Sequence, residues 1–414
     1  MSRPSEVLSL YRKLFGEDAE ALVSAPGRLD FLNTHQDYKG LPVVGVGINL
    51  RTYIAGSRAE ECRVYSKLLG SWDRFSPTSS LKGGGWFGDY LRASLKALKM
   101  MGYSAGCVKA VIDSDVPVGS GLASSAALTV AFIGLLNKLY KLGMSLQDIA
   151  EAAFTAENKV MGIPCGRLDQ YSSAYGGVVL IKTKPPYEVE EIKFRKGVFV
   201  VADSGIRHST ATIHPKRQAE INEALSRILA MKPPLRLRMK LGRNYWEPRW
   251  EELDEDELHP YLDELPARLA GRILYTLRAH YTTLIAVKAM NGIPPSPEEA
   301  EKLERLAGIK VKEIMRLEDW DLRLIGAIMT YQHQLLSSLY DVSLPEIDKL
   351  VEEAVVAGAY GAKLSGAGLG GSIIALTADT SIARRVYKRL LETGAAKAWI
   401  VRIDQGLIEH ALGG

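Results

Sequence analysis

The sequence is poor in the residues that build disulfide and metal scaffolds. It has three cysteines in 414 residues, Cys62, Cys107 and Cys165, and they are far apart, with no CxxC pair. An odd number of widely spaced cysteines predicts neither a disulfide framework nor a zinc site. We therefore expect a reduced, cytoplasmic protein.

Long apolar runs and a strong charge of one sign are also missing. The longest apolar stretch, Ala126–Leu136, is too short to span a bilayer, and Met1–Glu20 has no apolar core of the signal-peptide type. Lys and Arg total 52 against 48 Asp and Glu, which gives a net charge of +4. This small excess argues against nucleic-acid and membrane partners and is compatible with an anionic nucleotide substrate.

Hydrophobic periodicity divides the chain into two halves. The first half alternates strands, over 41–56, 108–112, 176–182 and 198–203, with helices over 7–15, 124–140 and 145–160. Ser145 followed by Asp148 predicts a capping box for the last of these helices. The second half is mostly helical, with a strong helix start at Ser296 and late strands over 371–376 and 398–403.

Residues 231–266 lie between the halves and have no clear periodicity. Their first part is basic with aromatics, and the part from Glu251 to Glu257 is acidic. We interpret the segment as an irregular insertion whose opposite charges partly pair, and an RNA-binding patch is the alternative.

The turn Pro117–Ala127 is the best candidate for a ligand site. It leads from a predicted strand into a long predicted helix, where small residues let backbone N–H groups approach a phosphate and the helix N-terminus adds partial positive charge. The alternative is a tight strand-to-helix turn with N-capping serines. The candidate nucleotide-binding residues are Pro117, Gly119, Ser120, Gly121, Leu122, Ala123, Ser124 and Ser125.

Two other nucleotide motifs are absent or misplaced. The sequence has no GxxxxGK[ST], which excludes a Walker-type P-loop. Gly366–Gly371 has the glycine spacing of a dinucleotide site but precedes a predicted strand instead of opening a helix, which disfavours a dinucleotide-dependent oxidoreductase.

Four segments in a fixed order carry a family resemblance. They are Pro26–Gly40 (PGRLDFLNTHQDYKG), the turn Pro117–Ala127, Ala156–Gln170 and Lys363–Ser372 (KLSGAGLGGS). With these segments the chain resembles the GHMP kinases, and within them the galactokinases, from about residue 20 to about residue 405.

The resemblance implies an α+β, two-lobed GHMP kinase fold. An N-terminal α/β lobe (ribosomal protein S5 domain 2-like) would occupy residues 1–200, and a C-terminal ferredoxin-like lobe would occupy 201–414 and contain the 231–266 insertion. The implied activity is transfer of the γ-phosphate of ATP, with Mg²⁺, to the anomeric hydroxyl of galactose or a close derivative. The protein would act as a monomer or homodimer.

Matching positions imply the catalytic and metal-binding roles. Asp169 would be the general base and Arg28 the cation beside it. Ser125 and Glu157 would bind Mg²⁺, whose preferred ligands are oxygens. The alternatives are an N-capping Asp169, a surface ion pair for Arg28 and a solvated Glu157.

The same resemblance implies the substrate contacts. His35 and Asp37 are separated by a single residue, so in an extended segment their side chains would face the same way, toward sugar hydroxyls. Gly166 would let the backbone approach the sugar, and Trp86 would stack on adenine, with ordinary core packing as the alternative.

Three positions depart from the galactokinase pattern. Thr34 replaces a glutamate that reaches the O6 end of the sugar, Lys39 replaces an asparagine, and His214 stands where galactokinases carry a sugar-contacting tyrosine. Fewer negative charges at this end lead to the hypothesis that the sugar is a uronic acid such as galacturonate, or an N-acetylated hexose.

Two other functions stay open. A sugar-sensing regulator with a kinase fold would need no catalytic base, so Asp169 disfavours it. A kinase for a non-sugar alcohol such as mevalonate is disfavoured by the His35-x-Asp37-Tyr38 motif.

Overall fold

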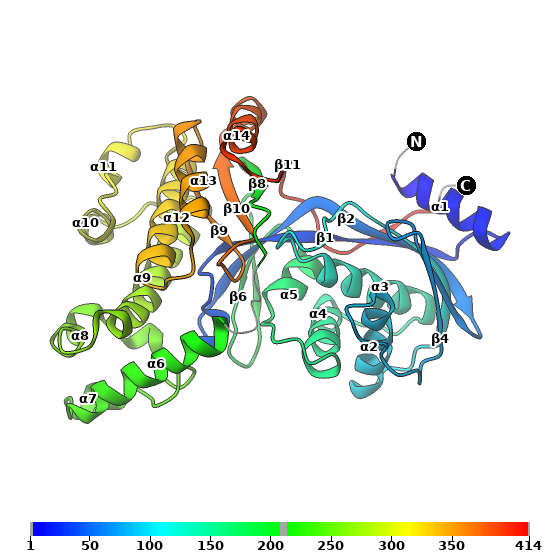
Figure 1. Cartoon of the computed structure of the whole chain (residues 1–414), viewed down its shortest axis with the longest axis horizontal. Helices are drawn as coiled ribbons and strands as arrows, with labels where there is room; N and C mark the ends of the chain where they lie inside the picture. Colours follow the sequence, from blue (N-terminus) through cyan, green and yellow to red (C-terminus); the bar gives the residue numbers. More distant parts are fainter. Residues whose placement is uncertain (1–2, 208–212, 413–414) are drawn as a thin grey trace. The chain divides into compact units, whose positions relative to one another are not determined.

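Strands β1 (Ala21–Leu32) and β2 (Val43–Ala59) each pass from one structural unit of the protein into the other (Figure 1). The structure, a computed structural model, describes residues 3–207 and 213–412. Unit 1 comprises Met1–Leu29, Gly45–Val179 and Ile403–Gly414, and unit 2 comprises Asp30–Val44 and Leu180–Arg402. The sequence-based division at residue 200 treats each lobe as one continuous segment, whereas the structure divides unit 1 into three segments and unit 2 into two.

The larger sheet has the strand order β12-β1-β2-β5-β3-β4, and β6 pairs with both β2 and β7. The β1–β12, β2–β5 and β3–β4 pairs are antiparallel, but β3 runs parallel to β5, with Arg63 opposite Lys109. The strands not yet defined are β3 (Cys62–Ser66), β4 (Ser71–Phe75), β5 (Cys107–Ser114), β6 (Val178–Ile181), β7 (Val189–Ile192) and β12 (Ile408–His410).

Most of the helices predicted for the first half of the chain are present in unit 1. Helix α3 (Ser124–Tyr140) follows the phosphate-site candidate and is apolar on most sides, which explains its burial. The predicted capping box opens α4 (Leu146–Phe154), because Ser145 and Asp148 exchange side chain–backbone hydrogen bonds. The other helical segments are α1 (Arg3–Phe15), α2 (Phe87–Met100), the π-helix η2 (Thr155–Val160) and α5 (Leu168–Tyr175).

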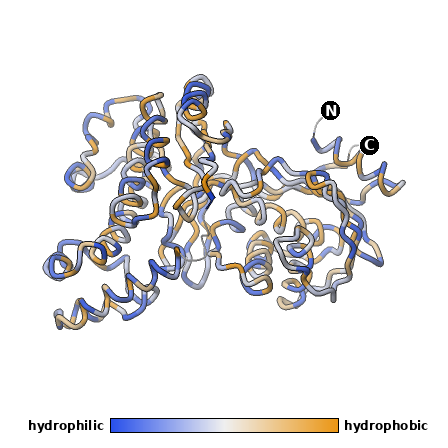
Figure 2. The backbone as a smooth tube through the Cα atoms, in the orientation of Figure 1, coloured by the Kyte–Doolittle hydropathy of each residue, from blue (hydrophilic) through white to orange (hydrophobic). Residues whose placement is uncertain are grey.

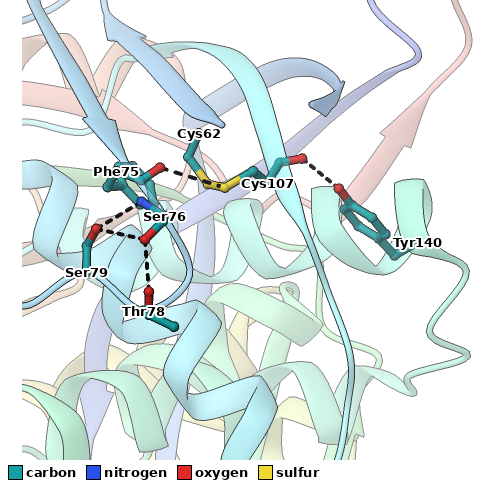
Figure 3. Close-up of a disulfide and its surroundings, with 7 residues drawn as sticks. All are labelled: Cys62, Phe75, Ser76, Thr78, Ser79, Cys107 and Tyr140. Carbon is teal, nitrogen blue, oxygen red and sulfur yellow. Dashed lines mark hydrogen bonds between the residues drawn. A yellow bond between two sulfur atoms is a disulfide. The ribbon is translucent and has the colours of Figure 1, made fainter. Parts of the chain in front are cut away.

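A disulfide joins Cys62 to Cys107, so the prediction of three unpaired cysteines is wrong for two of them (Figure 3). The two cysteines are 45 residues apart in sequence, but the parallel pairing of β3 with β5 brings their Cα atoms to 4.6 Å. Both side chains are buried. Cys165 keeps a free thiol, as predicted.

Unit 2 is built around a four-stranded antiparallel sheet of order β11-β8-β10-β9. Most helices of this unit lie beside the edges of the sheet or against one of its faces (Figure 1). The strands are β8 (Val198–Asp203), β9 (Gly361–Ser365), β10 (Ser372–Thr377) and β11 (Lys397–Val401). The helices are η1 (Asp37–Lys39), α6 (Ile213–Ala230), α7 (Leu235–Arg238), η4 (Trp250–Glu252), α8 (Glu255–Leu262), α9 (Ala267–Met290), α10 (Pro297–Ala307), α11 (Val311–Ile314), α12 (Trp320–Ser338), α13 (Pro345–Val356) and α14 (Thr380–Thr393).

Local signals set the ends of several of these helices. Ser296 caps α10 in the predicted capping box with Glu299, and Asp379 caps α14, which ends at Gly394 with φ of 114°. Both helices carry many hydrophilic residues (Figure 2). Among the described residues, no helix combines the length and apolar character required to span a membrane.

The segment 231–266 is more ordered than the sequence predicted. It contains α7, η4 and α8, and its apolar residues pack against α6 and α9 in one core that includes Trp250 and Leu258. Its charges pair in part, since the Lys240 Nζ lies 2.8 Å from a Glu257 oxygen. The sequence showed no periodic signal here because the aromatic and aliphatic side chains that pack into this core are irregularly spaced along the chain.

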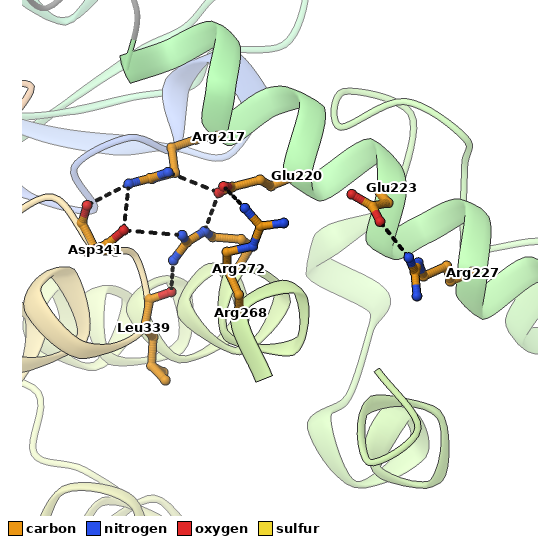
Figure 4. Close-up of polar contacts among 8 residues, drawn as sticks. All are labelled: Arg217, Glu220, Glu223, Arg227, Arg268, Arg272, Leu339 and Asp341. Atoms are coloured by element: carbon orange, nitrogen blue, oxygen red, sulfur yellow. Dashed lines mark hydrogen bonds and ion pairs between the residues drawn. The ribbon is translucent and has the colours of Figure 1, made fainter. Parts of the chain in front are cut away.

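A buried cluster of charges joins α6 to α9 and to the chain after α12 (Figure 4). The Glu220 carboxylate accepts hydrogen bonds from Arg272 at 2.6 Å, Arg217 at 3.0 Å and Arg268 at 3.2 Å. Arg217 and Arg272 also bind the backbone carbonyls of Asp341 and Leu339, respectively. Glu220 therefore pairs with three guanidinium groups, and the exposed Asp341 carboxylate adds pairs with Arg217 at 3.2 Å and Arg272 at 3.7 Å. Together these contacts fix the chain around residues 339–341.

We predict that Glu220→Gln lowers the free energy of unfolding by about 3–5 kcal/mol, because the variant leaves the buried Arg217 and Arg272 guanidinium groups with only the exposed Asp341 carboxylate. Chemical denaturation monitored by circular dichroism measures this change.

Glu223→Gln is the matched control, one turn further along α6. Glu223 pairs with Arg227 at 2.8 Å, but both side chains are largely exposed (Figure 4). We expect a change below about 1 kcal/mol. An equal decrease in the free energy of unfolding in the two variants would show that the buried cluster contributes no more stability than an exposed ion pair.

Candidate functional site

The turn Pro117–Ala127 adopts a conformation that only small residues accept easily. Gly119 and Gly121 have φ of 73° and 74°, and Ala123, which precedes α3, has φ of 58°. Gly119 has open space around it, since an added Cβ would meet no atom within 4 Å. The exposed glycine backbone directly before a 17-residue helix is therefore suited to approach by an anion.

Arg28 connects this turn to Asp169. The Arg28 Nε and Nη2 lie 2.8 and 2.7 Å from the same oxygen of Asp169, Oδ1. The Arg28 guanidinium also donates to the carbonyl of Gly121, and its backbone N–H donates to the carbonyl of Leu122. Arg28 is 6% exposed, so its alternative as a surface ion pair is wrong.

Asp169 lies inside the first turn of α5, whose N-cap is Arg167. It is therefore not an N-capping residue, which was the alternative for its role. Neither contact with Arg28 uses Oδ2, and the side chain is 30% exposed. The Asp169 carboxylate thus has one oxygen held by a buried cation and the other available to an acceptor hydroxyl.

Glu157 is a buried carboxylate, not a solvated helix-face residue. It is 3% exposed and accepts hydrogen bonds from Thr129 at 3.1 Å and from Gln170 at 3.0 Å. Burial raises the pKa of Glu157, as does the charge of Asp169, while the hydrogen bonds from Gln170, Ser125 and Thr129 lower it. Glu157 belongs to the π-helix η2. Single π-helical turns within helices occur frequently at functional sites.

The oxygen atoms of Ser125 and Glu157 suit a magnesium ion. The two side chains are within hydrogen-bond contact of each other, and both ligand types are oxygen. In residues 3–207 and 213–412, no group of three His, Cys, Asp or Glu side chains could by itself hold a metal. Mg²⁺ commonly takes one or two protein oxygens and completes its shell with phosphates and water.

Trp86 is held in place by a buried aspartate. Its Nε1 donates to Asp73 Oδ2 at 2.7 Å, and the same carboxylate binds Arg92 at 2.6 Å and Lys82 at 2.8 Å. Burial opposes ionisation of Asp73, but the bonds from Arg92, Lys82 and Trp86 hold its pKa at about 2. The indole is half-buried and ordered, so the structure permits both stacking on a base and ordinary packing against Phe87.

The sugar-motif candidates Thr34, His35, Asp37 and His214 all belong to unit 2. Of the segment around His214, residues 208–212 lie outside the described residues. The rings of His35 and His214 are 5.0 Å apart. His35 Nε2 donates to the carbonyl of Ala367 at 3.0 Å, which joins the first motif to the late glycine motif.

Thr34 is part of a buried network and is 2% exposed. Its hydroxyl donates to Asp30 Oδ1 at 2.9 Å and accepts from the Lys363 Nζ at 2.8 Å. Asp30 also accepts the backbone N–H of Gly366. The threonine therefore completes a chain of hydrogen bonds between two motifs of the sequence.

Lys39 does not lie where the sequence analysis placed it. It is 0% exposed, and its Nζ donates to Thr276 Oγ1 at 2.9 Å, so it adds no accessible charge for a ligand. The physical reason is the chain turn of η1, which directs the side chain into the interior between Tyr275 and Tyr340. The part of the uronic-acid hypothesis that depends on a ligand-facing Lys39 is wrong.

The structure thus gathers the predicted residues into two sets. Unit 1 contains Arg28, Trp86, the turn, Glu157, Gly166 in the loop before α5, and Asp169, and unit 2 contains the sugar-motif residues. The sequence analysis missed Asp30 and Lys363, although both stand within the quoted motifs. It also missed Tyr275 and Tyr340, which carry no motif signal because only the tertiary fold brings them to Lys39.

Family comparisons match three parts of the chain. The GHMP kinases N terminal domain matches residues 89–177, the GHMP kinases C terminal domain matches 316–396, and the galactokinase galactose-binding signature matches 9–58. The galactokinase of Pyrococcus furiosus is 30% identical over 379 residues, which cover 91% of this chain and 94% of that protein. The chain belongs to the galactokinases of the GHMP kinase family.

Further comparisons also cover most of the chain. The galactokinase of Thermococcus kodakarensis is 30% identical, with 86% of this chain and 88% of that protein covered. The solved structure of Lactococcus lactis galactokinase complexed with galactose has a TM-score of 0.77 at 23% identity, covering 98% of this chain and 99% of that one. Mevalonate kinase of L. major follows with a TM-score of 0.60 at 19% identity, covering 92% and 95%. These neighbours confirm the two-lobed GHMP kinase fold.

Proposed function

We propose that the protein transfers the γ-phosphate of ATP to the anomeric hydroxyl of galactose. The observation that carries this proposal is the Arg28–Asp169 pair beside the glycine turn, because it combines a base, a buried cation and a phosphate-binding backbone in unit 1. Phosphoryl transfer depends mainly on such positioning and charge neutralisation. The sugar named in the galactokinase relatives supports galactose as the acceptor.

The residues support the following reaction. Asp169 Oδ2 takes the proton of the C1 hydroxyl as that oxygen attacks the γ-phosphorus, and the bond to the β–γ bridging oxygen breaks to release ADP. Arg28 holds Oδ1 of the base and offers its charge to the transferring phosphoryl group. Backbone N–H groups of the turn, with Ser120 and Ser124, bind the phosphates of ATP, and Trp86 stacks on adenine.

Ser125 and Glu157 are assigned to Mg²⁺, which supplies charge neutralisation on the phosphates when bound. Thr34, His35, Asp37, Gly166 and His214 are assigned to the sugar. We propose a cytoplasmic location, and a monomer or homodimer as the active form.

We predict that a coupled ADP-release assay on a sugar panel gives the highest kcat/KM with galactose. The panel contains galactose, galacturonate, N-acetylgalactosamine, glucose and mevalonate, and phosphorus NMR identifies phosphate on C1. A higher kcat/KM with galacturonate or the N-acetylated sugar would support the uronic-acid or N-acetylhexose alternative instead. ADP release with none of the sugars, together with sugar binding by calorimetry, would indicate a regulator.

We predict that Asp169→Asn lowers kcat by about 10²–10⁴-fold, because the amide cannot accept the hydroxyl proton. Binding of ATP and galactose, measured by calorimetry, stays within about threefold of wild type. Asp18→Asn is the control, since Asp18 is 78% exposed in the same unit. Retention of most of kcat in Asp169→Asn would disprove the role of general base.

We predict that Glu157→Gln raises the Mg²⁺ concentration for half-maximal activity by about tenfold or more. In the wild type the same requirement increases as pH falls, because burial raises the pKa of Glu157 and only the ionised carboxylate binds the metal. Titration of activity with Mg²⁺ at several pH values measures both effects. Glu20→Gln, at an exposed pair with Arg58, serves as the control. A pH-independent Mg²⁺ requirement in the wild type would contradict the assignment.

A further inference from the structure

Lys39 is a buried lysine that is surrounded mainly by aromatic rings. Burial lowers its pKa well below the ordinary value, and the charge of Asp37 opposes this. Its Nζ lies 4.6 Å from the ring centre of Tyr340, 5.1 Å from that of Tyr275 and 5.7 Å from that of Tyr38. The Lys39 Nζ donates a hydrogen bond to the neutral hydroxyl of Thr276 at 2.9 Å. The negative faces of tyrosine rings stabilise a desolvated cation, so these three tyrosines form a cage for Lys39, which we call the tyrosine cage.

The tyrosine cage is in contact with the histidine pair of the sugar motif. The ring of His35 lies 5.3 Å from that of Tyr340 and 6.2 Å from that of Tyr38, and His214 lies 5.4 Å from Tyr38. The hydroxyls of Tyr38 and Tyr340 share a hydrogen bond of 2.5 Å. The orientation of both imidazoles therefore depends on rings that Lys39 holds together.

The buried charge cluster supports the same cage from the other side. Tyr340 stands between Leu339 and Asp341, whose carbonyls are held by Arg272 and Arg217, respectively (Figure 4). Tyr275 is fixed through its hydroxyl, which donates to the carbonyl of Thr34. The cage is thus built on rigid parts of unit 2.

His35 presents one nitrogen that lacks a partner. A carbonyl only accepts hydrogen bonds, so the bond to Ala367 places the proton of the neutral ring on Nε2. The other nitrogen, Nδ1, is buried and has no hydrogen-bond partner among the described residues. A buried acceptor of this kind is costly unless a donor reaches it, and a sugar hydroxyl is such a donor.

We propose that Lys39 is a positioning residue of the sugar end, whose tyrosine cage fixes the His35 and His214 rings so that His35 Nδ1 accepts a hydrogen bond from a hydroxyl of a neutral sugar. The proposal rests on the proposed function, because it assigns a role to residues of that site. It extends it by giving a role to Lys39, which is 0% exposed and so acts on the sugar through the two histidines and not by direct contact.

The charge of Lys39 also affects the two histidines, because it favours their neutral form. Burial lowers the pKa of His35 well below its ordinary value, and the charges of His214, Lys39 and Lys363 lower it further. The pKa of His214 is also lowered by burial and by Lys39, while Asp30 opposes this. The charged or titratable groups that face the pair are Asp30, Asp37, Tyr38, Lys39, His214, Tyr340 and Lys363.

The test is Lys39→Met, which keeps the length of the side chain and removes the charge. We expect KM for galactose to rise about tenfold while KM for ATP stays within about twofold. The acid limb of kcat/KM for galactose should move to higher pH, because loss of a nearby positive charge raises the pKa of both histidines. Nitrogen NMR of the imidazoles reports the protonation state of His35 directly.

Thr276→Val is the second variant, because it removes the hydrogen-bond acceptor of Lys39 and preserves shape. We expect the same changes at smaller size, about two- to threefold in KM for galactose. Lys310→Met, at an exposed pair with Glu304, makes the same chemical change away from the cage and should alter neither parameter.

The results separate this inference from the proposed function. A wild-type enzyme that phosphorylates galactose, with unchanged galactose KM and pH profile in folded Lys39→Met and Thr276→Val, overturns the inference alone. Equal increases in KM for ATP and galactose would also overturn it, since they indicate a general structural defect. Absence of galactose phosphorylation by the wild type is a failure of the proposed function.

Discussion

The Arg28 guanidinium makes the contacts on which the phosphate end of this protein depends. It binds Asp169 through two nitrogens, donates to the Gly121 carbonyl, and lies on β1, whose backbone meets the turn at Leu122. Gly27 makes this approach possible, since an added Cβ would come within 2.8 Å of the Leu122 carbonyl oxygen. A single buried cation therefore fixes Asp169 and the turn relative to each other, and phosphoryl transfer of the kind we propose requires such fixed geometry.

The sugar motif uses charge in a different way. Lys39 and Lys363 are both fully buried, the first among tyrosine rings and the second among oxygen acceptors from Asp30, Thr34 and Leu364. Neither ammonium is accessible to a ligand, so both act by holding the residues of the sugar motif in position. Desolvated cations are expensive, and tyrosine rings offset this cost for Lys39. The oxygens of Asp30 and Thr34 that offset it for Lys363 also connect the segments Pro26–Gly40 and Lys363–Ser372.

Features with a local physical cause were predictable from the sequence. Helix α3 and the capping boxes at Ser145 and Ser296 follow from periodicity and from side chains three residues apart. Strand β1 was not predicted, because a proline and a glycine interrupt its apolar pattern. The Cys62–Cys107 disulfide was not predicted either, because it depends on the register between β3 and β5.

By itself the sequence determined the family and located the glycine turn and the candidate base, since these are carried by short contiguous motifs whose chemistry requires those residue types. Only the tertiary structure decided what each charged side chain faces. Lys39 in the sequence is a charge next to a sugar motif, and in the fold it is an interior cation beneath two histidines. The reason is that burial, partners and electrostatic neighbours come from Thr276, Tyr275 and Tyr340, which are more than 200 positions away along the chain.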